Sequence, residues 1–241
     1  MLISIEGSTN NLSIALLKND VVISNETFNV KNELAQIIVP TINFFLNKNS
    51  IRINQLSAII VGCGPGSFTG IRTVIAAAKG IIFSNNNLQS IGVNGLAGLA
   101  ISVVDEALKN NIKYIISMID TKRGDVFLQL FKLNDQDKLL FPFRVMNEIE
   151  VLKIEHINEY LNKYNLNNKN ILFVGHRSNQ ISSNILNTKI SKSLFQYPKA
   201  TWIGKLALYL INRPEKANIK DITFDKFEPI YARSPEINKK I

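Results

Sequence analysis

The start of the chain alternates between short apolar runs and short polar turns, a pattern typical of consecutive β-strands. It predicts three antiparallel strands, Leu2–Glu6, Leu12–Leu17 and Val21–Thr27. Apolar residues then recur at helical spacing, which predicts a helix over Glu33–Asn47 with Asn32 as its cap. Strands and helices are expected to alternate over the rest of the first half. In chain order these elements are Ser57–Gly62, Thr69–Ser84, Gln89–Gly92 and Asn94–Leu108.

The second half repeats this order in a weaker form. No linker rich in Pro or Ser separates the halves, so we predict two packed lobes, residues 1–110 and a smaller, degenerate lobe over 111–241. The polar tail from Pro214 onward is expected to lie along the surface. The predicted strands are Tyr114–Ile119, Asp125–Phe131, Leu139–Val145 and Ile171–Gly175, and the predicted helices are Ile149–Tyr164, Ser178–Leu186 and Thr201–Asn212.

The order of these elements suggests a fold class. Three antiparallel strands followed by alternating helices and strands are the element order of the ribonuclease-H-like unit. Two such units form the two-lobed, actin-like ATPase fold (the ASKHA fold) of actin and the sugar kinases. We therefore expect an α/β protein of this class.

The first two predicted helices carry more apolar surface than one buried face requires. A surface helix normally shows one apolar stripe about 100° wide, whereas Glu33–Asn47 is apolar nearly all round, although Pro40 interrupts it. Such surplus suggests a protein interface. Burial of both faces within one domain remains the alternative. The candidate interface residues are Leu34, Ile38, Ile42, Phe45, Ile71, Val74, Ile75, Ala78 and Ile82.

Composition adds a basic second half to this picture. The 241 residues are 46% hydrophobic and carry a net charge of +9. Residues 1–110 hold 7 Lys and Arg against 6 Asp and Glu, while residues 111–241 hold 21 against 13. A basic half could face nucleic-acid phosphates. A solvated basic surface is the favoured alternative, because no aromatic-interleaved basic stripe is present.

Other features bear on the compartment. The chain has a single cysteine, no apolar run near the ~18 residues that span a bilayer, and no signal-peptide pattern at its start. These features favour a cytoplasmic protein without membrane association.

A glycine-rich loop between a strand and a helix is the main motif of the chain. Its residues Gly62, Gly64, Gly66, Ser67, Gly70 and Arg72 lead into a helix of small residues. Such a loop could cradle an anion. The spacing fits neither a P-loop, a dinucleotide fingerprint nor a nucleophile elbow. We therefore favour a structural role, a tight turn whose glycines let neighbouring segments pack closely.

For the remaining candidate groups, an ordinary structural role is the favoured interpretation. His156 and His176 are distant in sequence, so a shared metal site is not expected. Cys63 is interpreted as a small buried residue. Asp120 with Lys122 and Arg123 could line a cleft between the lobes, but an ordinary charge pair at a turn is favoured.

Several segments resemble the bacterial TsaB (YeaZ) family. GPGSFTG, from Gly64 to Gly70, closely resembles the family signature, and the segments Met1–Leu17, Ile115–Phe127 and Pro229–Glu236 resemble other family segments in the right order. Family members usually show Asp-Thr-Ser at the first turn, where this chain has Glu6-Gly7-Ser8-Thr9. This departure weakens any case for catalysis at that turn.

The resemblance implies the same two-lobed fold and a function. The chain would be a non-catalytic accessory subunit in the synthesis of threonylcarbamoyladenosine in tRNA. Its partners would be a TsaD-type catalytic subunit, whose metal-binding histidine pair this chain lacks, a TsaE-type small ATPase, and tRNA through the complex. Alone it would form a homodimer and bind no cofactor, with ATP or ADP only at the complex interface. An actin-fold ATPase or kinase, or a peptidase or chaperone-like protein, are the alternatives.

Overall fold

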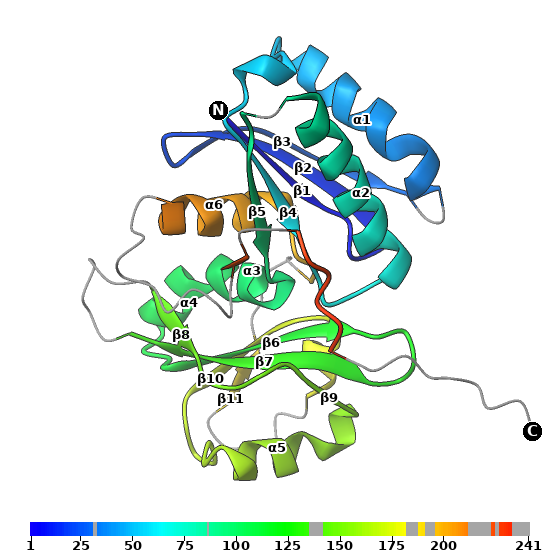
Figure 1. The fold of residues 1–241 in the computed structure, drawn as a ribbon. Helices are drawn as coiled ribbons and strands as arrows, with labels where there is room; N and C mark the ends of the chain where they lie inside the picture. Colours follow the sequence, from blue (N-terminus) through cyan, green and yellow to red (C-terminus); the bar gives the residue numbers. More distant parts are fainter. Residues whose placement is uncertain are drawn as a thin grey trace, which may run out of the picture.

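The computed structural model has two β-sheets, each covered by helices, stacked as two lobes (Figure 1). Within its described part, no helix is both long enough and apolar enough to cross a bilayer. The structure describes residues 1–30, 33–85, 87–134, 142–181, 188–190, 196–211, 223–224 and 227–232.

The first sheet has the strand order β12-β5-β4-β1-β2-β3. An antiparallel meander forms one side of it, from β1 (Leu2–Glu6), β2 (Asn11–Lys18) and β3 (Val21–Asn29). On the other side β4 (Ala58–Gly62) pairs in parallel with β1, and β5 (Gln89–Val93) pairs in parallel with β4. The three-strand meander predicted from sequence is confirmed.

Helices cover both faces of this sheet. On one face α1 (Leu34–Lys48) and α2 (Phe68–Ser84) pack side by side (Figure 1). On the other face α6 (Ala200–Ile211) lies against β1, β2 and β4. Because both faces are covered, every residue of β1 and β4 is buried, including the polar Ser4 and Glu6 of β1.

The second sheet has the order β11-β10-β6-β7-β8, with β9 paired to β7. A long antiparallel hairpin, β6 (Tyr114–Asp120) and β7 (Val126–Leu133), forms its centre. β10 (Ile171–Gly175) joins β6 in parallel, and α5 (Ile157–Lys163) packs its buried residues into the same core as this sheet. The short strands are β8 (Phe143–Val145), β9 (Glu150–Leu152) and β11 (Thr188–Ile190).

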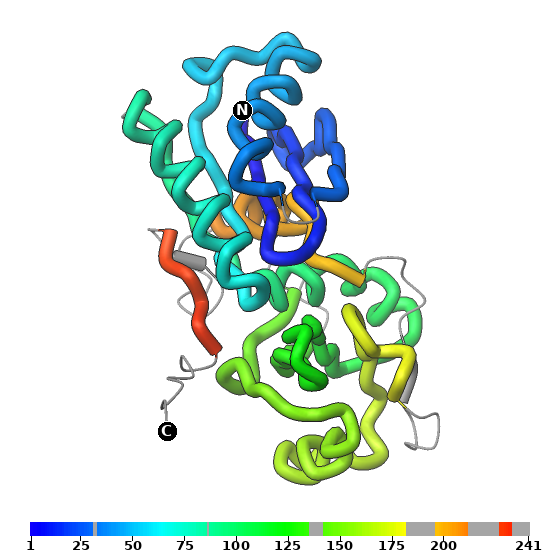
Figure 2. The backbone as a smooth tube through the Cα atoms, turned by 90° about the vertical axis from the view of Figure 1, so that its right-hand side faces the viewer, coloured from blue at the N-terminus to red at the C-terminus, as the bar shows by residue number. Residues whose placement is uncertain are grey.

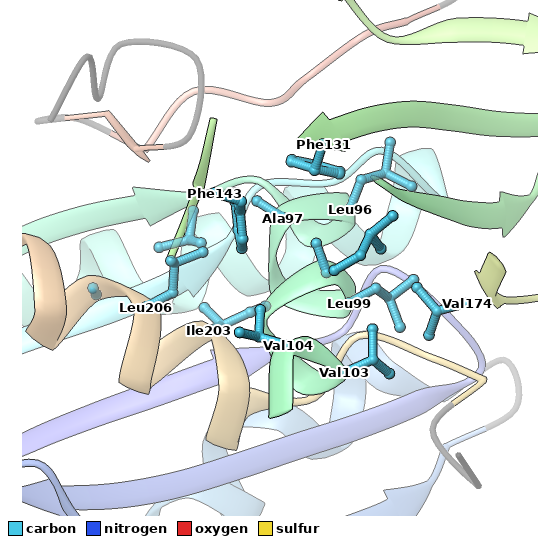
Figure 3. Close-up of a cluster of buried hydrophobic side chains, with 14 of the residues drawn as sticks. Leu96, Ala97, Leu99, Val103, Val104, Phe131, Phe143, Val174, Ile203 and Leu206 are labelled. Carbon is cyan, nitrogen blue, oxygen red and sulfur yellow. The ribbon is translucent and has the colours of Figure 1, made fainter. Parts of the chain in front are cut away.

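A helix between the two sheets joins the lobes through one core. α3 (Gly95–Ser102), capped by the Asn94 side chain, buries most of its length. In Figure 3 its residues lie among side chains from β7, β10 and α6. The labelled members of this core include Leu96, Leu99, Phe131, Val174, Ile203 and Leu206. The lobes are therefore packed against each other rather than tethered.

The predicted division at residue 110 is wrong for the C-terminal part of the chain. α6 covers the first sheet, and β12 (Thr223–Phe224) extends that sheet by pairing with β5. The segment Phe227–Ala232 also returns to the first lobe, where the Ile230 amide donates to the Cys63 carbonyl at 2.9 Å. The physical reason is that a sheet with two apolar faces must be covered on both.

Three element predictions also need correction. The helix predicted over Asn94–Leu108 is broken at Val103 into α3 and α4 (Val104–Lys109). The helix predicted from Ile149 begins at Ile157, because β9 pairs with β7 instead. Of the helix predicted over Ser178–Leu186, Ser178–Gln180 is a 3₁₀ turn, while residues 182–186 lie outside the described residues. Further 3₁₀ turns are Ile53–Gln55 and Ile154–His156.

Candidate functional site

The glycine loop packs directly on the first turn of the chain. The Ser67 side chain caps α2 by accepting from the Gly70 amide at 3.2 Å, and the Ser67 amide donates to the Ser8 carbonyl at 2.7 Å. A Cβ at Gly66 would overlap the Ser8 carbonyl, and one at Gly70 would overlap the Gly7 carbonyl. These glycines therefore permit a close approach that no other residue would allow.

The entrance of the loop is equally restricted. A Cβ at Gly62 would collide with the Glu6 carboxylate, and Gly64 has a φ of +97°, a backbone region that favours glycine. Close contacts or backbone conformation therefore restrict all four loop glycines, Gly62, Gly64, Gly66 and Gly70.

Arg72 has a different environment from the rest of the loop residues. Its guanidinium lies 3.6 Å from the centre of the Phe68 ring, and its Nε donates to the Tyr231 hydroxyl at 2.8 Å. Figure 2 shows the segment Phe227–Ala232 (red) running beside α2 toward the second lobe. Arg72 therefore links the start of α2 to this C-terminal segment.

Glu6 is a carboxylic acid buried in the first lobe. Its Oε1 accepts from the Ser8 amide at 2.6 Å, while its Oε2 has no hydrogen-bond partner among the described residues. Burial raises the pKa of Glu6 to about 7. A carboxyl group so enclosed does not line the cleft and is poorly placed to act on a ligand there.

A cleft of about 730 Å³ lies between the lobes. The first lobe contributes Ser8, Ser67 and Arg72, and the second lobe contributes the β6–β7 turn. In that turn Asp120 lies 3.8 Å from the Lys122 ammonium and 3.4 Å from the Arg177 guanidinium. The β6–β7 turn thus contains a charge pair between Asp120 and Lys122, and it also lines the cleft with these two residues and Arg123. The two interpretations left open by the sequence are therefore compatible.

His176 lines the same cleft and is only 9% exposed. Its ring packs edge-on against Tyr197 with the ring centres 4.4 Å apart, and neither ring nitrogen has a hydrogen-bond partner among the described residues. Burial, reinforced by the positive charge of Lys122, lowers the pKa of His176 to about 4. The imidazole is therefore neutral at pH 7.

The other two candidate groups are ordinary structural residues. His156 is exposed at the start of α5, and its Nδ1 lies 2.9 Å from Glu159. Cys63 is fully buried, and burial raises the pKa of its thiol to about 12, which makes it a poor nucleophile. Across the described ranges, no cluster of three or more His, Cys, Asp or Glu side chains could hold a metal ion.

The predicted interface residues face inward, which corrects their assignment. The first lobe's core contains nearly all of them, and Ile82, the exception, is partly buried against it. The strongest apolar stripe of each helix covers the sheet, because that stripe buries the most surface there. The core members are Leu34, Ile38, Ile42, Phe45, Ile71, Val74, Ile75 and Ala78.

Other apolar residues occupy the outer surfaces of α1 and α2. Val39 is 48% exposed and Phe44 57% on α1, while Phe83 is 89% exposed near the end of α2. A Cβ at Gly80 would meet no atom within 4 Å, so the helix surface there is open. We call the exposed surface of these two helices that carries Phe44, Gly80 and Phe83 the outer helix face. The sequence predicted surplus apolar residues on these helices, but the residues it named belong to the buried stripe and not to this exposed surface.

Comparisons of the chain with a protein-family model and with individual proteins agree with one another. The family model described as TsaD, tRNA N6-adenosine threonylcarbamoyltransferase, matches residues 22–237. The chain is 27% identical to the tRNA threonylcarbamoyladenosine biosynthesis protein TsaB of Haemophilus influenzae, over 100% of this chain and 96% of that protein. It is also 27% identical to TsaB of Bacillus subtilis, over 78% of this chain and 77% of that protein.

Solved structures support the fold. YeaZ from Pseudomonas aeruginosa superposes with a TM-score of 0.70 at 21% identity, over 95% of this chain and 98% of that one. A candidate N-acetylmannosamine kinase from Listeria monocytogenes superposes with a TM-score of 0.50 at 10% identity, over 88% of this chain and 99% of that one. The fold is thus the actin-like ATPase and kinase fold expected from the order of the elements.

Proposed function

The chain belongs to the family that the TsaD model describes and, within it, to the TsaB (YeaZ) proteins of tRNA threonylcarbamoyladenosine biosynthesis, and we propose that it is a non-catalytic scaffold subunit there. In this role it pairs with and activates the TsaD-type threonylcarbamoyl transferase, together with a TsaE-type ATPase and tRNA bound by the complex. In this proposal the protein and its complex are cytoplasmic.

The outer helix face is the observation that carries this proposal. Single exposed apolar residues are common, but Phe44 and Phe83 stand on two helices that pack side by side and are more than half exposed. The exposed Ala76 and Gly80 on α2 would let a helix of a partner approach closely. Apolar anchors beside small residues suit helix-to-helix packing with another subunit.

A non-catalytic role is supported by the chemistry of the described residues. The two histidines lie apart, one exposed on α5 and one in the cleft with a lowered pKa. Cys63 is buried as a thiol, and Glu6 is enclosed beneath the glycine loop. None of these groups is paired with a base or nucleophile in a way that supports covalent or metal-assisted catalysis.

The same face would join two copies when the chain is alone. A two-fold dimer, in which one patch meets its copy, is the simplest closed arrangement. The homodimer and the heteromer would then compete for one surface, so a single substitution should weaken both.

Phe83→Glu tests this proposal. Burying a Phe is worth about 1.5–3 kcal/mol, so the variant should weaken dimerisation and binding of the catalytic subunit by roughly 10- to 100-fold. The measurement is sedimentation velocity with and without the TsaD-type subunit, with circular dichroism to confirm folding. Leu108→Glu on α4 is the matched control, because Leu108 is 52% exposed on another helix. If Phe83→Glu and Leu108→Glu behave alike, the interface lies elsewhere.

A further inference from the structure

Two basic side chains stand opposite each other on neighbouring strands of the second sheet. Lys132 on β7 is the direct cross-strand partner of Arg144 on β8. Directly opposed residues of an antiparallel pair have their Cβ atoms about 4.5–5.5 Å apart, and like charges in this arrangement destabilise the sheet. An anion bound between the two cations would remove this repulsion.

No described acidic side chain offsets the charge of this pair. Among the residues that the structure describes, neither Lys132 nor Arg144 takes part in an ion pair. Arg144 is exposed, and Lys132 is half-buried with its ammonium 5.9 Å from the centre of the Tyr114 ring. Tyr114 is itself the cross-strand partner of Lys132 on β6. A row of one aromatic and two cationic side chains thus crosses three strands.

A third cation lies at the same end of the sheet. Ile171, at the start of β10, pairs with Tyr114, and the exposed Lys169 precedes Ile171 by two residues. The Asn170 side chain donates to the Asn111 carbonyl at 3.4 Å, which holds this loop beside the start of β6. Adjacent strands lie about 4.8 Å apart, so the three cations are spread over roughly 15 Å. We call the surface that carries these four side chains the basic strip, made of Lys169, Tyr114, Lys132 and Arg144.

The basic strip and the outer helix face belong to different lobes. Tyr114 packs at the border of the core that α5 shares with the second sheet. Side chains alternate between the two faces of a strand, so Lys132 shares a face with Leu130, a member of that core. Figure 1 shows α1 and α2 in one lobe and β6, β7 and β8 in the other. A helix packed on the outer helix face would therefore not cover the basic strip.

The arrangement of the cations favours a polyanion over a small ion. A nucleic-acid backbone offers a row of phosphates, each of which can take a separate cation, whereas one free phosphate cannot reach along the whole strip. An aromatic ring beside cations on a sheet is also typical of surfaces that bind single-stranded RNA. The half of the chain that carries the strip has 21 Lys and Arg against 13 Asp and Glu, which attracts such a polyanion.

We propose that the basic strip binds the phosphate backbone of tRNA directly, so that this chain adds contacts of its own to those of the complex. This rests on the proposed function, because it takes the RNA to be the tRNA on which the complex acts. It departs from the solvated basic surface favoured by the sequence. The strip could not be read from the sequence, since its members come from separate strands and a loop.

Fluorescence anisotropy of a labelled tRNA with the isolated chain tests the proposal. Arg144→Gln and Lys169→Gln should each weaken binding about tenfold at low salt, because each removes a charge-assisted contact with a phosphate. Each should also reduce the slope of log affinity against log salt concentration by about one. Lys18→Gln is the matched control, since it removes the same charge from an exposed position on β2, and it should change the affinity less than about twofold.

Arg144→Gln has a second expected effect that needs no RNA. Removing one of two opposed like charges should raise the midpoint of urea unfolding of the free chain, whereas Lys18→Gln should leave it unchanged. A lower midpoint for Arg144→Gln would contradict the repulsion on which the basic strip is argued. Circular dichroism of each variant confirms that the fold is retained.

Three binding results overturn the proposal. The strip is not an RNA surface if tRNA fails to bind below about 100 μM at low salt. If Lys18→Gln weakens binding as much as Arg144→Gln, tRNA binds by overall charge. If poly-glutamate binds as tightly as tRNA and displaces it, the strip is a site for acidic protein segments. The strip variants should still bind the TsaD-type subunit as the wild type does, so failure of the strip and failure of the outer helix face give different results.

Discussion

At the scale of single residues, Glu6 and His176 couple the stability of the fold to pH in opposite directions. Burial raises the pKa of Glu6 to about 7 from an ordinary value of 4.5, so the folded state binds this proton more tightly than the unfolded state. The stability contributed by the protonated carboxyl is complete below pH 4.5 and is lost as the pH rises to about 7. His176, with its pKa lowered to about 4 from 6.5, destabilises the fold as the pH falls through the same range.

Glu6→Gln isolates the carboxyl contribution. The variant keeps the oxygen that accepts from the Ser8 amide but cannot ionise. Its stability relative to the wild type should increase between pH 4.5 and 7, by about 3 kcal/mol as an order of magnitude. The measurement is urea unfolding of both proteins at a series of pH values, where His176 contributes equally to each. A stability difference that is constant with pH would show that Glu6 keeps an ordinary pKa.

At the scale of elements, the glycine loop and α2 place very different demands on their glycines. The loop must lie against the β1–β2 turn, and Gly66 faces the Ser8 carbonyl without room for a Cβ. Within α2, Gly80 is exposed and has open space where a Cβ would stand. The same amino acid is therefore a steric requirement at one position and a conformational cost at the other.

The pair Gly66→Ala and Gly80→Ala tests this difference. Gly66→Ala should destabilise the fold by roughly 1–3 kcal/mol, because the backbone must shift to admit the methyl group. Gly80→Ala should be neutral or stabilise it by up to about 1 kcal/mol, since alanine favours the helix. Chemical denaturation of both variants gives the comparison. Equal midpoints would mean that the loop relaxes without cost.

At the scale of the whole molecule, the two lobes are not independent units of the chain. α6 covers one face of the first sheet and shares the core of α3, which in turn packs on β6, β7 and β10. The first sheet is therefore complete only when residues from the far end of the chain have joined it.

A fragment of residues 1–110 should accordingly fail to fold alone. It lacks α6, so the buried side chains Ala15, Leu17 and Ile60 on that side of the sheet would face water. We expect no cooperative thermal transition by circular dichroism and rapid proteolysis. Co-expression of this fragment with residues 111–241 should restore both properties. Cooperative unfolding of the fragment by itself would contradict the shared-core description.

The sequence by itself determined most of the local elements, the fold class and the family. Strand and helix patterns are local, so β1, β2, α1 and α2 could be predicted from the period of their apolar residues. The position of the glycine loop could likewise be predicted, because its glycines lie between an apolar strand pattern and a helix pattern.

The tertiary structure alone decided which faces are buried and which residues meet. The apolar stripe of α1 could equally have faced a partner, and only the neighbouring sheet shows that Ile38 and Phe45 lie inside while Phe44 lies outside. The return of α6 to the first sheet, and the meeting of Arg72 with Lys122 and His176 around one cleft, join residues more than forty positions apart. Periodicity within a segment carries no information on such contacts, because they depend on how separate elements share the available apolar surface.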